Sequence, residues 1–95
     1  MSKPTRRPEL TYEEIEETGE LIVTDPVADR ATVLNPTAGF VWLLCDGATE
    51  PAAIAAEMIA ALGDAAPDAG TVTQDVQRFL EELAAKELLV AAGGA

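Results

Sequence analysis

Histidine is absent from the 95-residue chain, so the commonest general base and metal ligand of proteins is missing. The single cysteine, Cys45, excludes an internal disulfide, fits a reducing compartment and lies in an apolar stretch, as inert core thiols do. A glycine-rich phosphate loop is also lacking. Acidic runs such as Glu13-Glu14 are more typical of a solvated face than of an acid–base pair. These absences predict a protein that is not an enzyme, with no catalytic residue, no metal site and no cofactor.

Basic residues and membrane-like segments are scarce. The chain has six Lys and Arg against 17 Asp and Glu, which gives a formal net charge of −11. Such a charge repels phosphate backbones and anionic lipids and favours a partner with basic groups, although acidity also keeps a small protein soluble. The N-terminus lacks an apolar signal region, and no stretch is long enough to span a membrane. We therefore expect a cytoplasmic protein with no nucleic acid and no membrane among its partners.

Aromatic residues make up only 4% of the chain, but apolar residues as a whole reach 48%, as in globular proteins. A chain of this length suffices for one domain. Residues 1–10 hold half of the basic residues (Lys3, Arg6 and Arg7) together with Pro4 and Pro8, which predicts a flexible N-terminal arm. We expect one domain over residues 11–90, followed by a frayed C-terminal tail over residues 91–95.

Strand patterns occupy the early part of this domain. Residues 11–17, 21–24 and 30–34 form short runs with the alternation or β-branching of strands. The middle run is apolar enough to predict a strand that is buried on both sides or nearly so. Gly19 and Pro26 mark tight turns between the runs. The pattern predicts a three-stranded antiparallel sheet.

The next stretch holds the only Trp and the only Cys and carries helix punctuation at both ends. Asn35 can cap an N-terminus, Pro36 suits the first helical position, and Gly47 suits a left-handed stop. We expect a short helix, buried nearly all round, that joins the strands to the later helices. Its expected apolar stripe consists of Thr37, Val41 and Leu44, widened by Phe40 and Leu43.

Two further helices are expected. Thr49 should cap the second helix, which ends at Gly63 and has apolar residues at helical spacing, namely Ile54, Met58, Ile59 and Leu62. Residues 64–70 predict a loop. Thr71 and Gln74 then match a capping box at the start of the third helix. The apolar stripe of that helix consists of Val72, Val76, Phe79, Leu80 and Leu83.

Small acidic and helical classes can be weighed against these patterns. An acyl carrier protein needs a serine at a helix start, but the only serine is Ser2, so that class is excluded. A winged-helix DNA-binding domain has a similar architecture, but its recognition helix carries Lys and Arg. The third helix offers two bases, Arg78 and Lys86, against Asp75, Glu81, Glu82 and Glu87. DNA binding is therefore disfavoured, while a winged-helix interaction or regulatory module that binds protein stays open.

Several short motifs are shared with a known family. Leu34-Asn35-Pro36-Thr37-Ala38, followed by Trp42 and then Cys45-Asp46-Gly47, resembles the PqqD-like family of small peptide-binding domains, also called RiPP recognition elements. A second match covers residues 75–83 and then Leu88-Leu89. The resemblance spans residues 12–90, and the order and spacing of the motifs make it specific. The chain departs from the pattern at Glu87, where a Gly is usual, and this concerns the exit from the third helix.

The resemblance implies an α+β fold like a winged helix-turn-helix, with a three-stranded antiparallel N-terminal sheet followed by three helices. It also implies a non-catalytic adaptor that binds the leader segment of a ribosomally synthesised precursor peptide. Such an adaptor presents the peptide to a modifying enzyme, often a radical SAM protein or a leader peptidase, in natural-product or cofactor biosynthesis. An edge strand suits this role because its unpaired N–H and C=O groups can pair with an extended peptide.

By that resemblance, the peptide-binding edge is the third strand and the facing wall is the third helix. The strand contributes Arg30, Ala31, Thr32, Val33 and Leu34, and the helix contributes Asp75, Arg78, Phe79 and Glu82 along one side. Phe79 could offer an apolar floor and Arg78 could pair with an acidic leader residue, but a purely core Phe79 and a purely surface Arg78 stay open. The sequence also leaves open which of Thr32 and Val33 turns its main chain toward the peptide.

Overall fold

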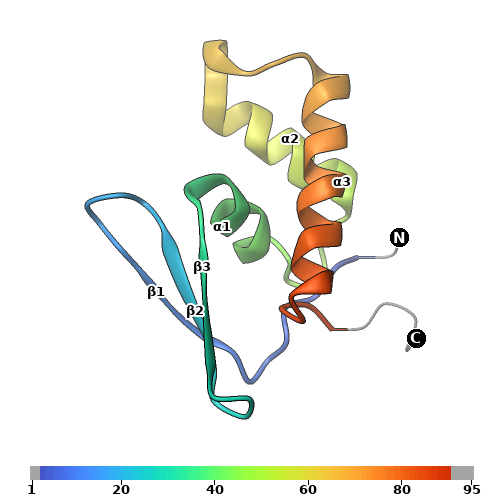
Figure 1. Cartoon of the computed structure of the whole chain (residues 1–95). Helices are drawn as coiled ribbons and strands as arrows, with labels where there is room; N and C mark the ends of the chain where they lie inside the picture. Colours follow the sequence, from blue (N-terminus) through green and yellow to red (C-terminus); the bar gives the residue numbers. More distant parts are fainter. Residues whose placement is uncertain (1–2, 91–95) are drawn as a thin grey trace.

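The computed structural model describes residues 3–90 and has three antiparallel strands followed by three helices, an α+β arrangement (Figure 1). This confirms the expected fold class. The strands are β1 (Thr11–Glu14), β2 (Leu21–Asp25) and β3 (Arg30–Leu34), and the helices are α1 (Pro36–Leu43), α2 (Pro51–Leu62) and α3 (Ala69–Ala85), with a 3-10 turn, η1 (Gly63–Ala65), before α3. The tail expected over residues 91–95 and the first residues of the expected arm, 1–2, lie outside the described residues.

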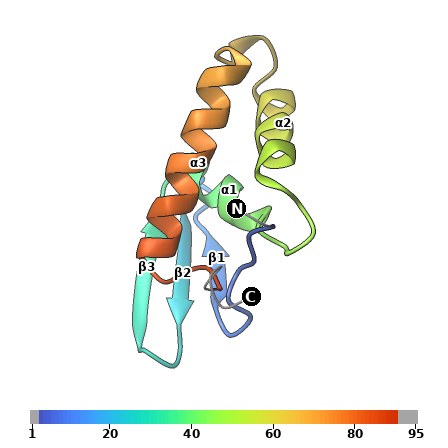
Figure 2. The same ribbon diagram turned by 90° about the vertical axis from the view of Figure 1, so that its right-hand side faces the viewer.

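The sheet has the order β1-β2-β3, so β2 is central and the other two strands are edges. Helices α1 and α3 lie over one face of it (Figure 2). On this face Leu21, Val23 and Asp25 of β2 are buried, whereas Ile22 is half-buried and Thr24 is exposed on the other. The expectation that β2 is buried on both sides or nearly so is wrong for the outer face, because no described element covers that face. Antiparallel sheets commonly leave one face to water.

Helix α1 begins as its sequence predicts and ends earlier. The Asn35 side chain accepts a hydrogen bond from the Ala38 amide at 2.8 Å, and the proline occupies the first turn. The helix stops at Leu43, and Gly47, with φ +79°, serves the loop that follows. One side of α1 is buried, including Trp42, whereas Leu43 is exposed. The expected all-round burial is wrong because no described element packs on the outward side.

Helix α2 follows Glu50 rather than Thr49, and no side chain caps it. Pro51 stands in its first turn, where the fixed φ of proline favours a helix and its missing N–H costs nothing. Gly63 ends the helix with a positive φ of 59°, as expected. The apolar side toward α3 is buried, but Leu62 at the end is 44% exposed.

Helix α3 begins before the expected capping box. Asp68 accepts hydrogen bonds from both the amide and the hydroxyl of Thr71 at 3.0 Å, so the helix starts at Ala69. A carboxylate is a strong N-cap and stands earlier in the chain, which places Thr71 inside the first turn. The expected apolar stripe is confirmed for its four buried members, whereas Phe79 is half-buried; the buried members are Val72, Val76, Leu80 and Leu83.

The end of α3 explains the departure at Glu87. The Leu88 amide donates to the Leu83 carbonyl and the Glu87 amide donates to the Ala84 carbonyl, both at 3.0 Å. This is the Schellman arrangement, which needs a left-handed residue just after the helix. Glu87 occupies that position with φ +61°. The chain therefore makes the turn that usually takes a glycine, with a strained glutamate in its place.

Residues 3–10, part of the expected flexible arm, lie against the domain; we call them the N-terminal strap. The Arg6 amide donates to the Cys45 carbonyl at 2.8 Å, and the Val90 amide donates to the Thr5 carbonyl at 2.8 Å. Pro4 and Leu10 are buried. These main-chain bonds join the strap to the loop after α1 and to the end of the described chain.

Trp42 occupies the centre of the core, as expected for the only Trp. It is 1% exposed, and its Nε1 donates to the Leu88 carbonyl at 3.1 Å. The Tyr12 ring meets it edge-on at 5.4 Å between centroids, and the Arg6 guanidinium lies 5.3 Å from its ring centroid. The indole therefore connects β1, the strap and the end of α3. Within residues 3–90, no helix combines the length and the apolar character needed to cross a membrane.

Candidate functional site

The direction of the main-chain groups in the sheet follows from one hydrogen bond. The Ile15 amide donates to the Glu20 carbonyl at 2.8 Å, so these two residues form a hydrogen-bonded pair. Hydrogen-bonded pairs alternate along an antiparallel ladder, so the next such pair is Glu13 with Ile22. Ile22 therefore points its N–H and C=O at β1, and its neighbour Val23 points its own at β3.

Two residues of β3 consequently turn their main chain away from the sheet. Val23 pairs with Thr32, so the N–H and C=O of Thr32 are engaged with β2. Ala31 and Val33, one residue to either side, direct these groups outward. In residues 3–90 neither has a main-chain partner outside the β2–β3 ladder. The β3 edge thus offers up to four main-chain hydrogen bonds to an added strand.

The side chains of β3 divide between the two faces of the sheet. Arg30, Thr32 and Leu34 lie on the helix side, where Leu34 is only 2% exposed and belongs to the core. Thr32 is half-buried. Ala31 and Val33 lie on the outer face, and Val33 is 54% exposed. Of the strand residues expected to bind peptide, Leu34 can therefore contribute only its backbone.

The α3 residues that were expected to form the wall lie along one flank of the helix. Phe79 is half-buried against the core, with the Arg78 guanidinium 5.5 Å from its ring centroid. Arg78 also pairs with Asp75 at 3.4 Å and remains 60% exposed, and Glu82 is exposed. Phe79 thus belongs partly to the core and partly to the surface.

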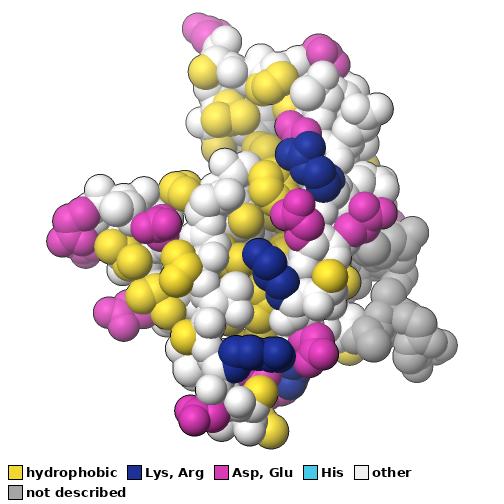
Figure 3. Space-filling model, in the orientation of Figure 1, with side chains coloured by type: hydrophobic (Ala, Val, Ile, Leu, Met, Phe, Trp, Pro, Cys, Tyr) yellow, Lys and Arg dark blue, Asp and Glu magenta, His cyan; other side chains and the backbone are white. Residues whose placement is uncertain are grey.

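Figures 1 and 3 show this flank of α3 and the β3 edge on the same side of the molecule. In Figure 3, hydrophobic side chains run down the surface between them, and Lys and Arg side chains lie alongside, interspersed with Asp and Glu side chains. We call this surface the β3–α3 face: residues 30–34 of the strand, with Asp75, Arg78, Phe79 and Glu82 of the helix. An edge strand beside a partly apolar helix flank is suited to hold an extended peptide.

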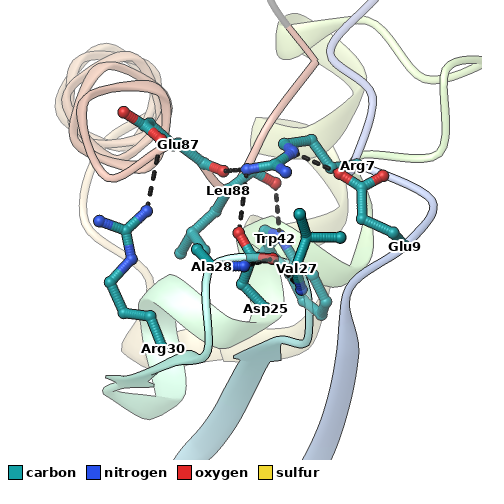
Figure 4. A network of polar contacts seen from close by, with 9 residues as sticks. All are labelled: Arg7, Glu9, Asp25, Val27, Ala28, Arg30, Trp42, Glu87 and Leu88. Atoms are coloured by element: carbon teal, nitrogen blue, oxygen red, sulfur yellow. Dashed lines mark hydrogen bonds and ion pairs between the residues drawn. The ribbon is translucent and has the colours of Figure 1, made fainter.

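Arg7 of the strap links the end of β2 to the turn that follows α3 (Figure 4). Its Nη1 donates to the Glu87 carbonyl at 2.8 Å and lies 3.3 Å from Asp25 Oδ2, while its Nε donates to Glu9 Oε1 at 2.6 Å. Asp25 is 4% exposed, so Arg7 supplies the charge partner that a buried carboxylate requires. The same guanidinium thereby contacts the end of β2 and the end of α3.

Asp25 in turn holds the β2–β3 turn. Its Oδ1 accepts hydrogen bonds from the Ala28 and Val27 amides, both at 3.0 Å. These bonds, that from Ala28 foremost, together with the positive charges of Arg7 and Arg30, hold the pKa of Asp25 below its usual value. The carboxylate therefore stays ionised and fixes the point at which β3 begins.

An exposed ion pair also connects β3 to the end of α3. Arg30 Nη2 lies 3.3 Å from Glu87 Oε2, with both side chains more than half exposed. Sequence reasoning missed Arg7, Asp25 and Glu87 as determinants of the site. An Asp before a Pro is a recognisable turn signal, but nothing local connects it to an arginine in the strap.

A hollow lies between the strap, β1 and α1. It has a volume of about 280 Å³, and its lining includes Arg6, Tyr12, Trp42 and Cys45. The Cys45 thiol is fully buried and donates to the Val41 carbonyl at 3.2 Å. Burial raises the pKa of Cys45 to about 12, so the thiol stays protonated and unreactive at neutral pH. The expectation of an inert core thiol agrees with this geometry. Among residues 3–90 no cluster of His, Cys, Asp and Glu could hold a metal ion.

Comparisons with known proteins bear on this geometry. The family model described as Coenzyme PQQ synthesis protein D (PqqD) matches residues 20–89. A solved structure titled "TbiB1 in Complex with the TbiA(beta) Leader Peptide" superposes with a TM-score of 0.71 at 25% sequence identity, covering 90% of this chain and 93% of that chain. No curated protein matches the chain.

Proposed function

We propose, since the chain belongs to the PqqD family of coenzyme PQQ synthesis protein D, that it binds the leader segment of a ribosomally synthesised precursor peptide. The leader adds to the sheet as a strand at the β3 edge. The structure with TM-score 0.71, TbiB1, is a complex with a leader peptide and supports this role. The observation that carries the proposal is the outward main chain of Ala31 and Val33 beside the apolar flank of α3.

The edge β3 suits a leader better than the other edge, β1. An added strand at β3 lies beside α3, where Thr32 and Phe79 can contact alternate side chains of the peptide. Among residues 3–90 the β1 edge has no helix flank of this kind, and its four residues are all exposed and end in Glu13-Glu14. Arg78, with its guanidinium largely exposed, is placed to pair with an acidic residue of the leader.

The chain acts in this proposal as a non-catalytic adaptor. It holds the leader in an extended form and presents the precursor to a modifying enzyme, a radical SAM protein or a leader peptidase, in natural-product or cofactor biosynthesis. Binding by main-chain hydrogen bonds tolerates varied leader sequences, whereas contacts with the α3 flank select among them. The adaptor needs no chemistry of its own, because its task is to raise the local concentration of substrate at the enzyme.

Hydrogen exchange tests the edge directly. In the free protein the Ala31 and Val33 amides should exchange fast and the Thr32 amide slowly. A synthetic peptide with the leader sequence of the precursor should slow exchange at Ala31 and Val33 and leave the β1 amide of Tyr12 unchanged. Tyr12 is the matched control because β1 is equally an edge. If the peptide slows amide exchange at β1 instead of β3, strand addition at β3 is contradicted. It is also contradicted if the peptide binds saturably but slows exchange at neither edge.

A further inference from the structure

The outer face of the sheet carries apolar residues that no described element covers. Ile22 of β2 and Val33 of β3 lie directly opposite each other on this face. Ile15, at the end of the β1–β2 hairpin, and Ala31 flank them. We call Ile15, Ile22, Ala31 and Val33 the outer apolar strip. Antiparallel sheets normally carry polar residues on a solvated face, so apolar side chains on this face indicate a surface that a partner covers.

Acidic residues border the strip on its hairpin side, where Glu13 lies directly opposite Ile22. The hairpin over residues 11–20 has no Lys or Arg and five glutamates, Glu13, Glu14, Glu16, Glu17 and Glu20. Within residues 3–90 none of these five takes part in an ion pair. Figure 3 shows hydrophobic side chains over the strands, at the left of the view, with acidic side chains around them. An apolar centre with a rim of one charge sign is the arrangement of a protein interface.

We propose that the outer apolar strip docks the modifying enzyme, through a surface on that enzyme with an apolar centre and a rim of Lys and Arg. The proposal rests on the adaptor function above and names where the second partner binds. The charge selects this occupant, since a second copy of a chain with net charge −11, or an anionic bilayer, meets repulsion at the same surface.

Leader binding enlarges the same docking surface. Residues that pair directly across two strands place their side chains on one face, so leader residues opposite Ala31 and Val33 lie on the outer face. There they continue the row formed by Ile22 and Val33. The enzyme therefore contacts adaptor and leader together and binds the loaded adaptor more tightly than the free one. By linkage the enzyme tightens leader binding by the same factor.

The test uses two probes, the synthetic leader peptide and the purified enzyme that modifies the precursor. The double variant Ile15→Thr with Ile22→Thr keeps β-branched side chains and removes apolar surface. We expect it to weaken enzyme binding by about tenfold or more in titration calorimetry, while leader affinity by anisotropy changes by less than about twofold. The control Leu62→Thr, an exposed leucine on α2, should change neither affinity.

A charge variant tests the rim. Glu16→Lys with Glu17→Lys should weaken enzyme binding and reduce its dependence on salt, whereas Glu81→Lys on the exposed side of α3 should not. Thermal melts confirm that each variant folds. If the leader binds every variant but the enzyme binds the double threonine variant as tightly as the parent, docking at the strip is wrong and the adaptor function stands. If sedimentation shows a parent dimer that the threonines dissociate, the strip joins two copies and the proposal is equally overturned. Failure of the leader to bind the parent is a failure of the adaptor function itself.

Discussion

Two proline substitutions at neighbouring positions of β3 separate the internal ladder from the open edge. Proline removes one N–H donor. At Thr32 this donor is engaged with Val23, whose carbonyl is then left buried without a partner, since Val23 is 1% exposed. An unsatisfied buried carbonyl costs about 1–3 kcal/mol, and the misfit of proline in a strand adds to it. Thr32→Pro should therefore lower the free energy of unfolding by about 3 kcal/mol, enough to unfold a small domain in part.

Val33→Pro should behave differently because the Val33 amide points away from the sheet. Proline is tolerated on an edge strand where its N–H side faces solvent, so we expect circular dichroism and melting close to the parent. The added strand loses one hydrogen bond and meets the pyrrolidine ring, so the dissociation constant for the leader should rise about tenfold, or about 1.4 kcal/mol. Val33→Thr is the control, because it changes the side chain and keeps the amide.

The assays are thermal melts for stability and anisotropy of a labelled leader peptide for affinity. If Val33→Pro unfolds the sheet while Thr32→Pro does not, the direction of the main-chain groups inferred from the Ile15–Glu20 bond is reversed. If Val33→Pro folds and binds the leader as tightly as the parent, strand addition at β3 is wrong. A loss of affinity in Val33→Thr equal to that in Val33→Pro would assign the effect to the side chain.

Further outcomes concern the framework of the site. Trp42 should emit with a blue-shifted maximum that moves red on unfolding, and Trp42→Ala should cost about 3–5 kcal/mol in a denaturant titration; a water-like maximum in the folded protein contradicts its burial. The pKa of Asp25 is lower in the folded than in the unfolded protein, so the ionised carboxylate stabilises the fold fully at a pH above the unfolded pKa, and this stabilisation disappears as the pH falls through the folded pKa. Asp25→Asn should therefore be less stable than the parent at pH 7. In thermal melts from about pH 7 to 2, the variant should also lose part of the parent's dependence of stability on pH. Glu87→Gly should raise the free energy of unfolding by up to about 1 kcal/mol, because relief of a left-handed glutamate exceeds the loss of an exposed pair with Arg30; Arg30→Gln measures that pair separately, and a destabilised glycine variant argues against the strain.

Elements with strong local signals could be predicted from the sequence. The bounds of β3 and the start of α1 were predicted correctly, because strand alternation runs up to a clear Asn35-Pro36 cap. The burial of Trp42 followed from its place among apolar residues between sheet and helices. The fold class also followed, since strand runs precede helical ones along the chain.

The remaining features depend on choices that no local pattern decides. Two N-caps compete at the start of α3, and Asp68 prevails over Thr71 because it stands first and carries a charge. The strap is held mainly by main-chain hydrogen bonds to residues distant in sequence. Such bonds use groups that every residue carries, so the pattern of side chains does not predict them. The direction of the β3 main chain depends on the hairpin closed at Ile15 and Glu20, because a one-residue change in register reverses every group.

An open edge strand is a hazard in most proteins, since it can pair with the same edge of another copy. This chain leaves β3 open for its proposed function and limits the hazard by other means. The strand is only five residues long, and it begins with Arg30, whose partner Glu87 belongs to the end of α3. The net charge of −11 makes two copies of the chain repel each other when they come closer than the Debye length. The same charge does not prevent a leader peptide from binding, because the side chains of Arg30 and Arg78 remain exposed on the β3–α3 face. The net negative charge thus opposes pairing between two copies at the β3 edge, while basic groups near the edge still allow the proposed leader to bind. We therefore predict that added salt promotes self-association before it abolishes leader binding.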